Sequence, residues 1–148
     1  MKTNLLKTVL LLFIAITSLT SCDDDDEVPE IVEPVIFNYA EGGNTLTEVS
    51  NPYANATTNK IFGNNASVNV IEITLQDLAV GSYTISGSNQ FKYTRPGTTS
   101  VWTAISGTVI ILEKENNKIS GSFDLTAGNS DLGINSVSGS FKRVTVNP

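Results

Sequence analysis

Three segments of the sequence decide its fold: Thr108-Val-Ile-Ile-Leu112, Ile119-Ser-Gly-Ser-Phe123 and Val137-Ser-Gly-Ser-Phe141. The first is a run rich in β-branched residues, and the other two alternate apolar residues or glycine with serine. Both patterns are typical of β-strands. The sequence therefore predicts three consecutive antiparallel strands, at about residues 106–115, 118–127 and 136–146.

The first two of these strands are separated by Asn116-Asn117, a pair that suits a two-residue turn with positive φ. Such a turn would pair Glu115 with Lys118 and Ile110 with Phe123. Val109 and Ile111 would then lie on the face opposite Phe123 and would need cover from another element. A three-residue turn is the alternative, and it would return both side chains to the core.

Glycine precedes each phenylalanine of the repeat by two residues, at Gly121 and Gly139. A glycine at this place leaves room for a crossing strand or for sharp coiling. If Phe123 and Phe141 lie opposite each other, they form a cross-strand aromatic pair. After Phe141 the polar pair Lys142-Arg143 interrupts the alternation, which predicts a β-bulge.

The rest of the domain also consists of short apolar stretches separated by polar turns. The alternation between residues 67 and 75 changes phase at Val70-Ile71, which predicts another bulge. Residues 40–66 form either a long irregular excursion or two short edge strands, and they are a candidate binding region. The predicted fold is all-β, an antiparallel β-sandwich or partly closed β-barrel of about 7–9 strands. Further strands are expected at residues 35–39, 83–85, 91–93 and 101–102.

The N-terminal residues have the parts of an export signal. Lys2 and Lys7 precede an apolar run of eight residues, Val9–Ile16, and the segment ends in Leu19-Thr20-Ser21-Cys22. Eight helical residues span about 12 Å, against about 30 Å of bilayer hydrocarbon. The run therefore predicts a signal peptide rather than a membrane span.

The Leu19–Cys22 segment resembles the lipobox of bacterial lipoproteins. The resemblance implies that Leu19, Thr20 and Ser21 are read by the signal peptidase and that Cys22 is acylated. Two or more acyl chains hold a protein firmly to a membrane. The alternative is a secreted protein with one free cysteine, which forms no internal disulfide. The predicted organisation is a signal peptide at 1–21, an acylated cysteine with an acidic flexible linker at 22–34, and the all-β domain at 35–148.

The linker carries almost all the net charge. Its seven acids include the run Asp23, Asp24, Asp25, Asp26 and Glu27, and no base accompanies them. The whole sequence has a formal net charge of −6, and removal of the signal with its two lysines gives −8 for the mature chain. The linker accounts for −7 of this charge and the domain for −1. A nearly neutral domain argues against nucleic acid as a partner.

The acidic run resembles the export signal of Bacteroidota surface lipoproteins. This resemblance implies an outer-membrane lipoprotein that faces outside, and a periplasm-facing protein is the alternative. An aspartate directly after the cysteine also resembles the enterobacterial signal for retention at the inner membrane. A spacer without sorting meaning is a further interpretation. The segments Ile119–Phe123, Gly128–Asn135 and Gly139–Phe141 resemble a group of small Bacteroidota lipoprotein domains of unknown function, which implies a β fold and no known activity.

The absence of histidine from the sequence limits the catalytic mechanisms and metal sites that the protein can have. Without imidazole, Ser-His-Asp and Cys-His catalysis and nearly all zinc sites are excluded. Glu113 and Glu115 share a strand face, but their place beside a turn indicates a solvated hairpin end. Asp131 lies in an oxygen-rich loop that lacks the acidic spacing of a calcium site. We therefore expect no enzyme activity, no metal and no cofactor.

Trp102, Tyr93 and Tyr53 are candidate ligand contacts, because aromatic rings can stack on sugars. Core or rim packing is the alternative for all three. The predicted function is a membrane-anchored, non-enzymatic binding or accessory module with a glycan or an envelope protein as its partner. A structural subunit of an envelope complex would instead show an apolar surface patch of several hundred Å². A carboxylate-based hydrolase would show two acids converging in a cleft.

Overall fold

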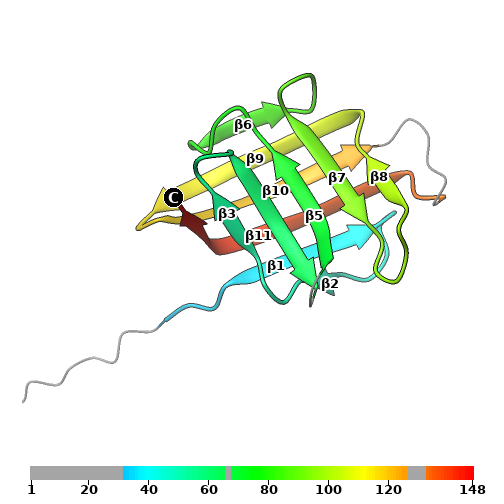
Figure 1. The fold of residues 1–148 in the computed structure, drawn as a ribbon, viewed down its shortest axis with the longest axis horizontal. Coiled ribbons are helices and arrows are strands. Elements are labelled where there is room, and N and C mark those ends of the chain that lie inside the picture. Colours follow the sequence, from blue (N-terminus) through cyan, green and yellow to red (C-terminus); the bar gives the residue numbers. More distant parts are fainter. Residues whose placement is uncertain (1–31, 66–67, 127–132) are drawn as a thin grey trace, which may run out of the picture. The chain divides into compact units, whose positions relative to one another are not determined.

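The computed structural model describes residues 32–65, 68–126 and 133–148, and it confirms the all-β fold class (Figure 1). Residues Glu33–Pro148 form one compact unit, and no helix occurs in the described ranges. The described strands are β1 (Ile36–Glu41), β2 (Thr47–Glu48), β3 (Tyr53–Asn55), β4 (Lys60–Asn65), β5 (Val68–Thr74), β6 (Gly81–Thr84), β7 (Gln90–Thr94), β8 (Val101–Thr103), β9 (Ser106–Glu115), β10 (Lys118–Thr126) and β11 (Ser136–Asn147).

The strands form two layers that are joined through β11. One layer has the order β6-β9-β10-β11-β1-β2, and the other has the order β3-β4-β5-β7-β8. The last residues of β11, Val146 and Asn147, pair in parallel with β3, while the rest of β11 pairs with β10 and β1. In Figure 1, β5 and β7 cross steeply over β9, β10 and β11. This crossing is the geometry of an orthogonal sandwich that is partly closed into a barrel.

Aromatic rings from both layers fill the interior. Phe37 lies 6.0 Å from Phe123 and 5.8 Å from Phe141, measured between ring centroids. Phe91, from the opposite layer, lies 5.3 Å from Phe123 and 6.0 Å from Trp102. All five side chains are buried. Because each buried aromatic side chain contributes about 1.5–3 kcal/mol, this cluster is a main source of stability.

The two phenylalanines of the repeat do not face each other. Phe123 is paired with Gly139, and Phe141 is paired with Gly121. A Cβ atom added to Gly121 would lie 2.6 Å from Cζ of Phe141 and 2.1 Å from the carbonyl oxygen of Ile110. Each glycine therefore leaves room for the ring of the neighbouring strand and for the close approach of a backbone.

The β9–β10 hairpin confirms the predicted turn and corrects the predicted register. Asn116 and Asn117 have φ values of 50° and 56°, and Glu115 pairs with Lys118. The expected pairing of Ile110 with Phe123 is wrong, because Phe123 pairs with Val109.

The cause is a β-bulge rather than a longer turn. Ser120 pairs with Glu113 and Gly121 pairs with Ile111, so Leu112 is an extra residue on β9. The bulge reverses the parity of the strand beyond it. Val109 and Ile111 consequently point into the core, and Ile110 and Leu112 point outward.

Both bulges expected from the sequence are present. On β5, Gly63 pairs with Ile71 and Asn64 pairs with Asn69, which leaves Val70 as the extra residue. On β11, two residues, Lys142 and Arg143, oppose the single residue Ser120. Arg143 has a φ of 55°, and its amide donates to the hydroxyl of Ser120 at 3.2 Å.

Residues 40–66 carry more structure than expected, since β2, β3 and β4 all begin there. β4 lies inside the second layer, and β3 lies between β4 and the end of β11, so neither is a free edge strand. The predicted signal, lipid and linker residues up to Ile31, with Cys22 and the run Asp23–Glu27, lie outside the described residues, as does Asp131. The described part of the chain contains no helix long and apolar enough to cross a membrane.

Candidate functional site

A polar pocket of about 340 Å³ opens where β1 ends, beside the turn that follows β7. We call it the end pocket. Residues 133–136, which lead into β11, form its remaining wall. Its lining residues are Glu41, Gly42, Asn44, Arg95, Gly133, Ile134, Asn135 and Ser136.

An ion pair between Glu41 and Arg95 forms one side of the end pocket. Nη2 of Arg95 donates to Oε2 of Glu41 at 2.5 Å, and Nε donates to Oε1 at 3.3 Å. The hydroxyl of Tyr93 donates to the same Oε1 atom. The guanidinium of Arg95, followed by the Tyr93 hydroxyl, holds the pKa of Glu41 below its ordinary value of 4.5, although desolvation opposes this effect. The carboxylate is therefore ionised and fixed at neutral pH.

Core aromatic residues hold the walls of the end pocket in place. Tyr93 is fully buried, and its ring lies 5.2 Å from that of Tyr39. Burial, followed by the hydrogen bond to Glu41, raises the pKa of the Tyr93 hydroxyl, so it stays a proton donor. On the other wall, Nε1 of buried Trp102 donates to the carbonyl oxygen of Ile134 at 2.9 Å. The polar rim is thus attached to a rigid interior from two sides.

The other polar groups of the end pocket face solvent. Asn44 and Asn135 are exposed, and Ser136 is half-buried. Gly42 and Gly133 have φ values of 57° and 67°, and an added Cβ at either would meet open space. The amide of Gly42 donates to the carbonyl oxygen of Ser136 at 2.9 Å, which joins the two walls.

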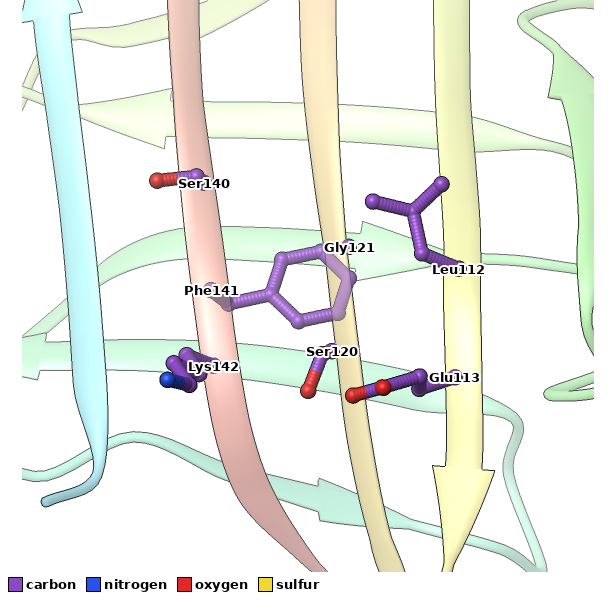
Figure 2. A pocket seen from close by; sticks show the side chains of 7 residues that line it. All are labelled: Leu112, Glu113, Ser120, Gly121, Ser140, Phe141 and Lys142. Carbon is purple, nitrogen blue, oxygen red and sulfur yellow. The ribbon is translucent and has the colours of Figure 1, made fainter. Parts of the chain in front are cut away.

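A second hollow, of about 510 Å³, lies on the outer face of the first layer (Figure 2). We call it the outer hollow. It sits between the bulges of β9 and β11, and Gly121 of β10 lies between its two sides. Figure 2 shows the ring of Phe141 reaching from β11 toward Gly121. The remaining lining residues are Leu112, Glu113, Ser120, Ser140 and Lys142.

The three aromatic candidates do not form one platform. Trp102 and Tyr93 are buried in the core, as the packing alternative expected. Tyr53 is half-buried and stacks on Phe62 at 4.8 Å, on a part of the second layer that β4 and β5 separate from β7. Trp102 and Tyr93 instead support the end pocket from beneath.

The acidic candidates also lie apart from the end pocket. Glu113 and Glu115 are both exposed beside the β9–β10 turn, as expected for a solvated hairpin end. Within residues 32–65, 68–126 and 133–148, no three side chains of the metal-binding types gather into a site.

The sequence indicated only one part of the end pocket. Glu41, Arg95 and Ser136 are far apart in the chain, and only the topology brings them together. The candidate binding region at residues 40–66 contributes Glu41, Gly42 and Asn44, but nothing in the sequence links it to Arg95 or to residues 133–136. Two dipeptides of turn type, Gly42-Gly43 and Pro96-Gly97, mark two of the segments that meet there.

One comparison with known proteins gave a match. A family model described as Domain of unknown function (DUF6252) matches residues 47–145. The matched span includes Arg95 and residues 133–136 of the end pocket, and it begins after Glu41. No curated protein and no solved structure matched the chain.

Proposed function

The chain belongs to the DUF6252 family, and we propose that it is a lipid-anchored, non-enzymatic binding module of the bacterial cell surface. The anchor is Cys22, which follows a short apolar run and three residues of lipobox type. The acidic run after Cys22 supports display on the outside of the outer membrane, as in Bacteroidota surface lipoproteins. A periplasm-facing protein is the alternative location.

The binding role is carried by one observation, the end pocket. Its volume lies at the lower end of the range for small-molecule sites. Its charged side chains are already paired, and buried Tyr93 and Trp102 fix its walls. Such a site is formed before its ligand arrives, so binding costs little conformational entropy.

The same site argues against hydrolysis. Glycoside hydrolysis requires two carboxyl groups on either side of the scissile bond. Among the described residues that line the end pocket, Glu41 is the one carboxylate, and Arg95 holds it ionised. This arrangement suits recognition better than proton transfer.

The anchor is tested with Cys22→Ala in the full chain. We expect the variant to leave the membrane fraction, because the acyl chains would have no attachment site. Unchanged membrane retention would contradict lipidation at Cys22.

The binding role is tested by thermal unfolding of the full chain with a panel of sugars, amino acids and organic acids. A ligand of the folded state raises the unfolding temperature. We expect a shift that Asn135→Ala reduces and that Asn51→Ala, at an exposed position that does not line the pocket, leaves intact. A shift that is the same in both variants would place binding elsewhere.

A structural subunit of an envelope complex is the second candidate, and the outer face of β9 favours it. Leu112 and Val80 are 62% and 60% exposed, and Ile110 also points outward. Gly81 pairs with Ile111, so the register places Val80 beside Leu112. Exposed apolar side chains that lie side by side in this way are candidate contacts for a protein partner. This role predicts that Leu112→Ser lowers the apparent mass of a native envelope complex.

A further inference from the structure

We infer that the end pocket binds a neutral, polyhydroxylated ligand, that is, an uncharged saccharide. This inference rests on the proposed function, because it names the ligand class of the proposed binding site.

The charge of the end pocket excludes an ionic ligand class. Glu41 and Arg95 neutralise each other at 2.5 Å, and the other lining side chains are uncharged. An anionic ligand would have to compete with Glu41 for Arg95, and a cation would have to compete with Arg95 for Glu41. Either competition leaves one partly buried charge without its partner, which is costly.

The hydrogen-bonding groups of the end pocket match hydroxyl groups. A carboxylate only accepts and a guanidinium only donates, whereas a hydroxyl does both. Among the described residues no hydrogen bond uses Nη1 of Arg95. A vicinal diol can therefore accept from Arg95 and donate to Glu41 at the same time, without separating the pair.

The rest of the lining supports the same class. The amide groups of Asn44 and Asn135 and the hydroxyl of Ser136 each offer a donor and an acceptor. Gly42 and Gly133 carry no side chain over the opening, so a bulky ring can approach the backbone. Ile134 also lines the pocket but is almost fully buried, so the surface that a ligand meets is mainly polar.

The chain carries its own reporter of occupancy. Trp102 is the sole tryptophan, and its Nε1 donates to the carbonyl oxygen of Ile134 in the pocket wall. A ligand that packs on this wall changes the surroundings of the indole and hence its fluorescence.

The experiment titrates the full-length lipidated protein, in a detergent without a sugar headgroup, while tryptophan fluorescence is recorded. The neutral probes are dextran, mannan and galactan, and the acidic probes are polygalacturonate and alginate. We expect a saturable change with at least one neutral probe and none with the acidic ones.

Two matched variants make the test specific. Glu41→Gln removes the negative charge and leaves Arg95 as a cation, so it should weaken neutral binding about ten-fold or more and create binding of acidic probes. Glu72→Gln breaks the Lys60–Glu72 ion pair, which joins β4 and β5 at 2.8 Å. This variant should bind the neutral probes as the wild type does and should not bind the acidic probes. An unfolded Glu41 variant would be recognised by its thermal transition. In that case Asn135→Ala, at an exposed position, provides the same neutral-binding test.

The outcomes separate the inference from the proposed function. Wild-type protein that prefers acidic probes would overturn the inference and leave the binding role standing. A fluorescence change with none of the probes, together with no thermal shift in the small-molecule panel, would overturn both.

Discussion

At the scale of single residues, glycine decides how closely neighbouring strands of the first layer can approach. Gly121 and Gly139 lie where a Cβ atom would overlap both a neighbouring carbonyl oxygen and a phenylalanine ring. The sequence indicated this role through the repeated Ser-Gly-Ser-Phe segments. It did not indicate that each phenylalanine lies over the glycine of the other strand, because that depends on the register between the strands.

Gly121→Ala tests this close approach. We expect a loss of about 1–3 kcal/mol or more in the free energy of unfolding, because the added methyl group overpacks a filled core. Urea unfolding followed by tryptophan fluorescence measures it. Gly81→Ala is the control, since its nearest neighbour would lie 3.8 Å from the new Cβ, an ordinary contact. Equal losses in the two variants would contradict the packing described for Gly121.

Glu41 gives the protein a pH dependence. Its pKa is lowered in the folded state, chiefly by Arg95, so its contribution to stability is present above the ordinary value of 4.5. The contribution is lost as the pH falls through the lowered folded value. We expect Glu41→Gln to cost about 1–3 kcal/mol at pH 7, through the loss of charged hydrogen bonds.

The measurement is the unfolding free energy of both proteins between pH 7 and pH 3. The wild type should lose its advantage over Glu41→Gln below pH 4.5, so the two curves should converge on acidification. A constant difference over the whole range would show that Glu41 acts through its shape and not through its charge.

At the scale of strands, the sequence predicted two bulges and missed a third. The bulges at Val70 and at Lys142-Arg143 break an alternation of apolar and polar residues, so they are visible in one strand alone. The bulge at Leu112 lies at the end of a continuous apolar run, Val109–Leu112, which has no alternation to interrupt. Only the pairing with β10 shows it, and for this reason the predicted faces of Val109 and Ile111 were reversed.

A pair of neighbouring isoleucines tests the corrected register. Ile111 is 1% exposed and Ile110 is 37% exposed. Ile111→Ala should therefore cost about 2–5 kcal/mol, the usual range for a buried isoleucine. Ile110→Ala should cost less than about 1 kcal/mol, and chemical denaturation measures both. A larger loss for Ile110→Ala than for Ile111→Ala would instead support a hairpin without the bulge, in which Ile110 faces the core.

The β9–β10 turn offers a stabilising change. Asn117 has a φ of 56°, a region that glycine adopts without strain and that asparagine tolerates. Asn-Gly is the favoured sequence for a two-residue turn with both φ values positive. Asn117→Gly should keep or raise the unfolding midpoint, and Asn117→Val should lower it, because a β-branched side chain is strained there. A thermal scan of the two variants decides the point.

At the scale of the whole molecule, topology creates the end pocket. Its residues come from β1, from the turn after β7 and from the segment before β11, which the sandwich brings to one end. No local pattern could have grouped them, because alternation predicts which face a residue takes and not which distant segment lies beside it. The candidate binding region at residues 40–66 came closest, since Glu41, Gly42 and Asn44 line the pocket. Trp102 and Tyr93 hold the pocket walls but do not form a sugar-stacking surface.

The division of charge along the chain leads to a last prediction. The acids of Asp23–Glu27 lie before the compact unit, which begins at Glu33, and the domain itself has a net charge of only −1. If the run is a sorting signal, replacing it with Asn-Asn-Asn-Asn-Gln should lower the fraction of protein that external protease can reach on intact cells. The thermal unfolding of the domain should stay the same, because no residue of the compact unit changes. Replacing the four aspartates with glutamates, which keeps the charge, is the control. Unchanged surface exposure of the neutral variant would show that the segment serves only as part of a spacer. The twelve linker residues 23–34 reach up to about 40 Å when fully extended.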